Sequence, residues 1–115
     1  MYSSLQIWQQ IIGQAELQDF EIHTVPQSRK TPVWFRVSTD GRTVFINQAR
    51  ENTPSSSLKL PRVITFDEFD RIFPYYELRL NGTSISQEAT SKSVNTVYIY
   101  GLIANAICNF KFKNE

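Results

Sequence analysis

The sequence predicts one α+β domain, in which an antiparallel sheet of three or four strands packs with one face against helices from both ends of the chain. Two observations predict this class. Apolar residues recur with a helical period near both ends, whereas strand-period alternation fills the part between them. The chain has 115 residues, of which 41% are hydrophobic, which is enough for one core but not for two domains.

A helix is predicted over about residues 3–15. Its apolar residues recur at three- and four-residue steps, which places them on one face: Leu5, Trp8, Ile11, Ile12 and Ala15. Ser3 or Ser4 is expected to cap the first turn, because a hydroxyl oxygen accepts a hydrogen bond from a free backbone N–H. Gly13 weakens the last turn, so we expect the helix to end near Ala15.

Three strands are predicted from alternating residues at about 20–25, 33–38 and 43–47. Pro26 ends the first strand. Asp40-Gly41 between the second and third strands predicts a type I′ hairpin turn, which needs positive φ at both central positions. Consecutive strands with short connections pair antiparallel, so we expect a meander. A fourth strand over 58–64 stays open, with Pro61 placing it at an edge or splitting it.

Two or three helices are predicted in the second half of the chain, and the third is a short one over 84–90. The first covers about 66–73, where Pro74 ends or kinks it. Thr65 caps this helix and Glu68, three residues later, completes a capping box. The second covers about 95–110, and its wide apolar stripe is formed by Ile99, Leu102, Ile103, Ala106, Ile107 and Phe110. Each helix therefore has a face to bury against the sheet.

No residue pattern predicts an enzyme, a cofactor or a metal site. His23 is the only histidine, and its strand position is typical of a sheet-face or surface residue. Cys108 is the only cysteine, so no disulfide forms within the chain, and its apolar neighbours predict a buried side chain. Asp67, Glu68 and Asp70 form an acidic group in a predicted first helical turn, where carboxylates favour the helix dipole.

The charge distribution is the feature that favours a nucleic-acid partner, although the formal net charge is only +1. Residues 26–64 hold seven basic and two acidic residues, and this excess falls on the predicted sheet and its loops. Trp34 lies among these charges, and basic residues beside aromatic ones bind phosphates and stack bases. The residues expected to contact nucleic acid are Arg29, Lys30, Arg36, Arg42, Arg50 and Arg62. An ordinary solvated sheet face with no nucleic-acid partner explains the same pattern slightly better and stays open.

Two other binding functions also stay open. Aromatic residues expected to be exposed, namely Trp34, Tyr75 and Tyr76, would form an interface for another protein or for a homodimer. A pocket between the sheet and the helices, lined by Trp8, Trp34 and Tyr98, would instead bind a small molecule.

The N-terminal segment differs from a secretory signal, since it lacks a basic start and an unbroken apolar stretch. The longest apolar-rich stretch, 97–108, is too short to cross a bilayer. We therefore expect a cytoplasmic protein with no membrane partner.

Several short motifs run through the second half of the chain: Ser55-Ser56-Ser57, Arg62-Val63-Ile64, Phe66 with Phe69, Tyr75-Tyr76, and Asn95-Thr96-Val97-Tyr98-Ile99. In this order they resemble a small accessory module found beside bacterial restriction and HNH-type endonuclease regions. The resemblance covers about residues 33–107 and implies a bacterial, DNA-associated part that leaves catalysis to another domain. The chain also resembles orphan proteins of mobile gene cassettes, which share no common function. The expected function is therefore a non-catalytic interaction module.

Overall fold

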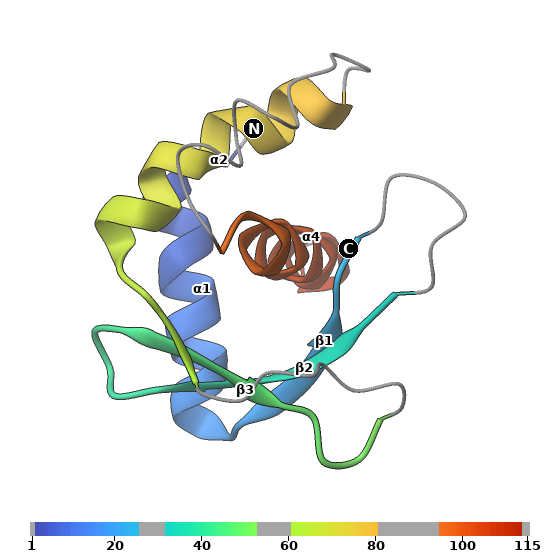
Figure 1. Cartoon of the computed structure of the whole chain (residues 1–115). Coiled ribbons are helices and arrows are strands. Elements are labelled where there is room, and N and C mark those ends of the chain that lie inside the picture. The colour runs from blue at the N-terminus through green and yellow to red at the C-terminus, as the bar shows by residue number, and fades with distance from the viewer. Residues whose placement is uncertain (1, 26–31, 53–60, 81–94, 114–115) are drawn as a thin grey trace.

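The computed structural model describes residues 2–25, 32–52, 61–80 and 95–113. The elements follow one another as α1 (Ser4–Leu17), β1 (Phe20–His23), β2 (Trp34–Thr39), β3 (Val44–Gln48), β4 (Arg62–Ile64), α2 (Phe66–Leu80) and α4 (Thr96–Lys113) (Figure 1). This order, a helix followed by strands and then two helices, confirms the predicted α+β class.

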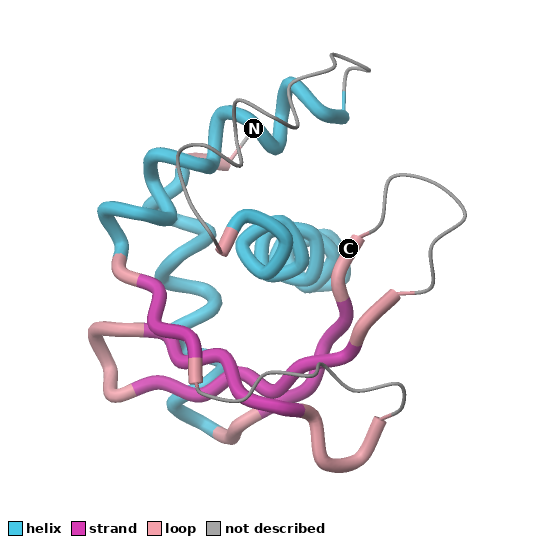
Figure 2. The backbone as a smooth tube through the Cα atoms, viewed as in Figure 1, coloured by secondary structure: helices cyan, strands magenta, loops and turns pink. Residues whose placement is uncertain are grey.

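The four strands form one antiparallel sheet in the order β1-β2-β3-β4, so the predicted meander is correct (Figure 2). β1 stops at His23, two residues before the expected end. The fourth strand exists but is only three residues long, Arg62–Ile64, and the expected positions 58–60 lie outside the described residues. Every strand pairs with its neighbour in sequence, which leaves β1 and β4 as the two edges.

Alternation along the strands gives the sheet an inward and an outward face. Phe35 and Val37 of β2 are fully buried, while Trp34 and Arg36 between them are only partly buried. Opposite partners share a face, so the cross-strand pair Val37↔Ile46 points inward. The inward face carries the core, and the outward face keeps its side chains partly exposed.

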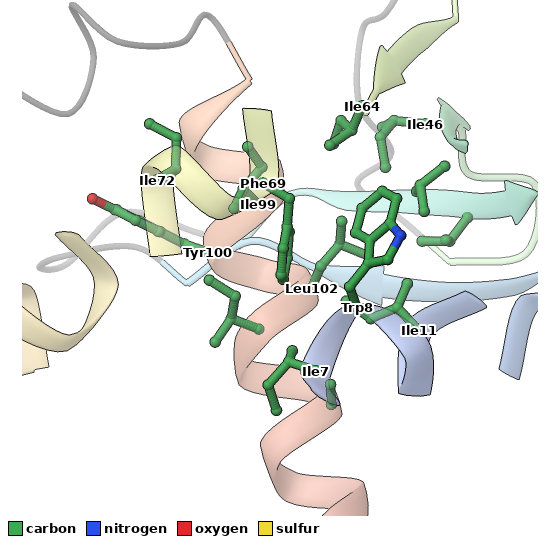
Figure 3. Close-up of a cluster of buried hydrophobic side chains, with 14 of the residues drawn as sticks. Ile7, Trp8, Ile11, Ile46, Ile64, Phe69, Ile72, Ile99, Tyr100 and Leu102 are labelled. Carbon is green, nitrogen blue, oxygen red and sulfur yellow. The ribbon is translucent and has the colours of Figure 1, made fainter. Parts of the chain in front are cut away.

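The hydrophobic core lies between the inward face of the sheet and the three helices (Figure 3). Trp8 of α1 packs against Phe69 of α2, with ring centroids 5.1 Å apart. Ile99 and Leu102 place the first half of α4 in the same cluster, and both are fully buried. α4 thus lies in the middle of the fold, packed against β1, α1 and α2, while α1 lies beside it and also packs against the sheet through β2 (Figure 1).

α1 begins as expected and ends later. The Ser3 hydroxyl accepts the N–H of Gln6 at 3.1 Å, and the side-chain oxygen of Gln6 accepts the N–H of Ser3 at 2.8 Å. The helix continues past Gly13 to Leu17 rather than ending near Ala15. Ala15 is buried in the core, so tertiary packing carries the helix through the glycine.

The β2–β3 hairpin is confirmed, but its turn is not type I′. Four residues, 40–43, connect the strands. Gly41 has a φ of 96°, whereas no described non-glycine residue has a positive φ, so Asp40 lacks the type I′ conformation. The carboxylate of Asp40 instead accepts the N–H groups of Thr43 at 2.8 Å and Arg42 at 2.9 Å. These hydrogen bonds lower the pKa of Asp40 and replace the tight turn with a side-chain-capped one.

α2 continues past Pro74, which is expected to end or kink it, and so extends beyond the predicted end at 73. It begins after Thr65, whose hydroxyl accepts the N–H of Glu68 at 3.3 Å, which confirms the predicted cap. It then continues to Leu80, and the short helix expected over 84–90 lies outside the described residues. Pro74 is exposed, while Tyr76 on the inner side is buried, so packing of the inner face outweighs the hydrogen bond that the proline cannot donate.

The start of α2 is tied to the start of α4 by a buried amide. Asn95 is 5% exposed, and its Nδ2 donates to the Glu68 carboxylate at 3.1 Å. The acidic residue predicted to serve its own helix therefore also joins two helices.

Candidate functional site

The structure describes four of the six predicted basic residues: Arg36, Arg42, Arg50 and Arg62. Arg42 lies in the turn before β3 and Arg50 lies after its end, so the length of β3 separates them. Arg62 lies on the edge strand β4, opposite an inward-facing residue of β3, and its side chain is exposed. Arg29 and Lys30 lie outside the described residues. Arg50 lies near Arg36, since both contact the Glu21 carboxylate, Arg50 through its backbone N–H, whereas Arg42 lies at the other end of β3.

Arg36, the basic residue at the centre of the outward face, is paired with two carboxylates. Its Nη1 donates to Glu21 Oε2 at 3.3 Å, and its Nε lies 3.6 Å from Asp19 Oδ2. The Arg36 side chain is 19% exposed. Glu21 is its direct cross-strand partner. The positive charge at the centre of this face is therefore matched by neighbouring negative charge.

The Glu21 carboxylate accepts several hydrogen bonds that no sequence motif predicts. Its side chain is 4% exposed. It accepts the backbone N–H of Arg50 at 2.8 Å, of Glu51 at 3.1 Å and of Asn52 at 3.0 Å, and also the side-chain amide of Asn52 at 2.9 Å. Three consecutive backbone N–H groups facing one anion form a nest, and here the chain's own carboxylate fills it. Glu21 thereby holds the segment after β3 against β1.

The pKa of Glu21 reflects this environment. Burial raises the pKa, but the hydrogen bonds from Arg50, the Asn52 side chain, Glu51 and the Asn52 backbone outweigh burial and lower it from 4.5 to about 2. Glu21 is therefore ionised at neutral pH, and its oxygens already have their hydrogen-bond donors.

The aromatic residues expected to form an exposed interface divide between the core and the surface. Tyr76 is only 6% exposed and packs against Tyr100, with ring centroids 5.6 Å apart, so the prediction that it is exposed is wrong. Its burial follows from the continuation of α2 past Pro74. Tyr75 is partly buried against the core. Trp34 is partly exposed on the outward face of the sheet.

The aromatic trio expected to line a pocket is not brought together. Trp8 is 6% exposed and sits in the core, with its ring centroid 5.1 Å from that of Phe69. Tyr98 packs edge-on against Phe35, with ring centroids 5.2 Å apart. Trp34 does line a pocket, but a different one, at the edge of the sheet.

This pocket, which we name the β1–α4 pocket, has a volume of about 310 Å³. Glu21, Ile22 and His23 of β1, Val25 beyond it, and Trp34 of β2 form its sheet side. The rings of His23 and Trp34 meet edge-on with centroids 5.0 Å apart. His23 Nδ1 lies 2.9 Å from the carbonyl oxygen of Thr24; because a carbonyl only accepts, Nδ1 carries the proton in this contact.

α4 contributes one face of mostly small residues to the lining of the β1–α4 pocket. Gly101, Ala104, Asn105 and Cys108 have the spacing i, i+3, i+4, i+7 and all line the pocket. Cys108 is exposed, so the prediction of a buried thiol is wrong. The apolar neighbours that prompted it, such as Ala106, turn toward the core, whereas the face of Cys108 turns to the pocket.

Sequence reasoning missed Glu21 and Asn105, the two polar residues that define this region. A signal existed for Asn105, because a lone amide on the small-residue face of an apolar helix is unusual for a core position. None existed for Glu21, whose hydrogen-bond partners are 15 to 31 residues away.

Within the ranges that the structure describes, no group of three or more His, Cys, Asp or Glu side chains is placed to hold a metal ion. No described helix combines the length and the apolar character needed to cross a bilayer. Comparison of the chain with models of protein families, with curated proteins and with solved structures finds no match. The functional interpretation therefore rests on geometry and chemistry.

Proposed function

We propose that this chain is a non-catalytic protein-interaction module, and that it binds a partner protein through the outward face of its sheet around Trp34. The pairing of Arg36 with Glu21 and Asp19 carries this proposal. Affinity for nucleic acid comes mainly from cations that neutralise phosphates, and the central cation of this face is already neutralised. A face of this kind fits a protein surface better than a phosphate backbone.

The composition of the outward face supports the same conclusion. Trp34 and Phe45 are partly exposed there, and Val63 of β4 is 50% exposed. Phe45 and Val63 are opposite partners in the register, so they form one apolar contact area. Aromatic and arginine side chains are enriched at protein interfaces, where a few of them carry most of the binding energy.

The size of the face sets the strength of the interaction. The four strands hold 18 residues, and with about 4.8 Å between strands and about 3.3 Å per residue their outward face covers roughly 300 Å². A stable interface takes about 800 Å² from each partner, so this face alone supports a weak and transient complex. We therefore expect a partner protein that presents uncharged apolar side chains, bound reversibly, rather than a permanent homodimer.

In the test, a photo-cross-linking amino acid replaces Ser38 on the outward face of the sheet. In a control variant, the same amino acid replaces Gln9 on the exposed side of α1. A protein cross-linked only from position 38 is then purified and titrated against the chain. Trp34→Ala is expected to weaken this complex at least tenfold, as truncation of an aromatic anchor does. Leu17 is 89% exposed at the end of α1, outside the outward face of the sheet. Leu17→Ala is therefore expected to leave the affinity of the complex unchanged.

A nucleic-acid partner is the competing outcome. Fluorescence anisotropy with single-stranded and double-stranded DNA at low salt is expected to show no saturable binding. Binding that weakens steeply with salt and is lost in Arg42→Ala or Arg50→Ala would overturn the proposal. It would favour the DNA-associated role that the resemblance implies.

A further inference from the structure

We propose that the partner protein adds a short extended segment to the free edge of β1, where its main chain pairs with the backbone of Glu21 and His23. This inference rests on the proposed function and deepens it, because Trp34 of the outward face also lines the pocket beside this edge.

The register of the sheet determines which backbone groups of β1 face away from β2. The N–H of Thr24 donates to the carbonyl oxygen of Val33 at 3.0 Å, and these two residues are opposite each other when the register of β1 and β2 is continued by one position. Hydrogen-bonded and non-hydrogen-bonded pairs alternate along an antiparallel ladder. His23 and Glu21 therefore occupy non-hydrogen-bonded positions, and their N–H and C=O groups point away from β2.

Three of these four groups have no partner in the described part of the chain. The carbonyl oxygen of His23 is the covered one, because a Cβ at Gly101 would lie only 2.9 Å from it. Among the described residues, none donates to the carbonyl oxygen of Glu21, and none accepts the N–H of Glu21 or of His23. A strand edge with unpaired N–H and C=O groups is a template for a further strand.

The opposite edge of the sheet is closed by a side chain. The carbonyl oxygen of Val63 in β4 accepts Nδ2 of Asn95 at 3.4 Å, so it faces away from β3 and is occupied. Asn95 is 5% exposed and also donates to Glu68, which fixes its amide in place. A strand added to β4 would have to displace this buried contact, whereas β1 offers unpaired groups.

The β1–α4 pocket lies beside the open edge. Residues 21–23 line it on the sheet side, and its volume of about 310 Å³ is at the small end of the range of roughly 300–1,000 Å³ for ligand pockets. Ala104 and Cys108 line it on the α4 side with small side chains. The pocket therefore fits a short extended segment, and the contact of Gly101 with the His23 carbonyl oxygen sets the limit of the pairing.

A second copy of the chain fits this edge poorly. Antiparallel pairing of two β1 strands through Glu21 would bring Asp19 of the copy beside His23, where α4 already contacts the edge. The copy would also bring α1, which ends at Leu17, directly behind its β1. An extended segment without an attached helix avoids both collisions. Main-chain pairing of such a segment is the β-augmentation mode of peptide recognition.

The test uses the whole chain and a defined probe, an acetylated and amidated pentapeptide of alternating threonine and valine, two residue types that favour strands. NMR measures hydrogen exchange of single backbone amides. In the free chain, the N–H groups of Glu21 and His23 are expected to exchange faster than that of Ile22, which lies at a hydrogen-bonded position. The peptide is expected to slow exchange at Glu21 and His23 with a dissociation constant on the order of 1 mM. Exchange at Val63, on the opposite edge, is expected to stay unchanged.

Methylation of the peptide nitrogens separates main-chain pairing from side-chain contact. A peptide methylated at alternate residues keeps one hydrogen-bonding edge and is expected to bind within about threefold of the parent peptide. A peptide methylated at every residue has no N–H donor left and is expected to bind at least about tenfold more weakly. Both peptides are tested on the unaltered chain, so the comparison does not depend on a variant that folds.

Two substitutions at one position test the protein side of the pairing. His23→Pro removes a free N–H but no hydrogen bond of the β1–β2 ladder, because proline is tolerated on a strand edge whose N–H faces outward. His23→Ala keeps this N–H and is expected to bind the parent peptide at least about fivefold more tightly than His23→Pro does. Thermal unfolding reports whether both variants are folded.

Three results would overturn the inference: unchanged exchange at Glu21 and His23 with peptide at about five times the expected dissociation constant, equal binding of the fully methylated peptide, or slowed exchange at Val63 instead. Dimerisation in sedimentation experiments that slows exchange at Glu21 and His23 without peptide would overturn the partner assignment in favour of a second copy. These failures are distinguishable from failure of the proposed function, which is measured by cross-linking from position 38.

Discussion

Gly101 of α4 lies against the carbonyl oxygen of His23 in β1, so closely that a Cβ at position 101 would be 2.9 Å from that oxygen and 3.2 Å from the Phe35 ring. One of these neighbours is backbone and the other is a fully buried ring, so neither moves easily. The close crossing brings α4 onto β1 at one of the residues that line the β1–α4 pocket.

Gly101→Ala is therefore expected to destabilise the fold by about 1–3 kcal/mol, because the added methyl group overpacks this crossing. Urea unfolding at neutral pH measures the change. Gly13→Ala is the matched control, since nothing lies within 4 Å of a Cβ at Gly13 in α1. Alanine there is expected to stabilise by about 0.5–1 kcal/mol through its higher helix propensity. Equal effects at the two sites would contradict the close approach.

Glu21→Gln is expected to destabilise the fold by about 2 kcal/mol at pH 7, because it removes charge-assisted hydrogen bonds to the segment after β3 and the partner of Arg36. Asp19→Asn, at the 46%-exposed carboxylate on the other side of Arg36, is the control and is expected to change stability by less than about 0.5 kcal/mol. Denaturant unfolding of both variants gives the comparison, and similar losses would argue against a special role of Glu21.

The same carboxylate makes stability depend on pH. Its folded-state pKa of about 2 is below its ordinary value of 4.5, so its contribution is full above pH 4.5 and is lost as the pH falls toward 2. Unfolding free energies measured between pH 6 and pH 2.5 are expected to decline in the wild type. The decline is expected to be smaller in Glu21→Gln, and an identical slope in the two proteins would refute this assignment.

Gly41→Ala is expected to destabilise the β2–β3 hairpin by about 1 kcal/mol, because its φ of 96° is unfavourable for a residue with a Cβ. Gly41→Asn is the matched comparison and is expected to lose less, since asparagine tolerates positive φ better than alanine. Thermal unfolding of the two variants is the measurement. Loss of equal size in both would indicate that the turn adjusts its backbone.

Pro74→Ala is expected to stabilise the protein by at least about 1 kcal/mol, because alanine restores an N–H donor inside α2 and removes the clash of the proline ring. Thermal unfolding and the helical signal in circular dichroism are both expected to increase. A decrease in stability would show that the packing of Tyr76 depends on a bend at the proline.

The order and type of the elements were predictable because the apolar pattern is regular. Apolar residues alternate with more polar ones along 34–38 and 44–47, which identifies the residues that face the core from a sheet. Apolar residues three and four positions apart in α1 identify its buried face in the same way. The errors lie where a local rule meets a tertiary contact. Judged by local sequence alone, Pro74 is expected to end or kink a helix. α2 nevertheless extends beyond it, because Tyr76 on the extended part is buried in the core. Asp40-Gly41 predicts a tight turn, but the Asp40 carboxylate binds two backbone N–H groups and widens it.

The candidate site was less predictable, because it is assembled from distant segments. The sequence shows how many basic residues the chain has, but not which of them are paired with carboxylates. The pairing of Arg36 with Glu21 depends on the register of β1 against β2. The β1–α4 pocket joins residues of β1 to residues some 80 positions later. The sequence shows only an apolar helix over this part of α4. Which residues face the core and which line the pocket is decided by how the helix packs against the sheet.

The central position of α4 has a consequence for the order of events during synthesis. The ribosome makes all four strands, α1 and α2 before it makes α4, so the sheet can pair while the inward sides of Phe35 and Ile22 still lack the helix that covers them. Exposed apolar surface on an incomplete sheet is prone to aggregate. Substitutions in α4 that slow its docking are thus expected to reduce soluble yield in cells more than equilibrium stability alone would indicate.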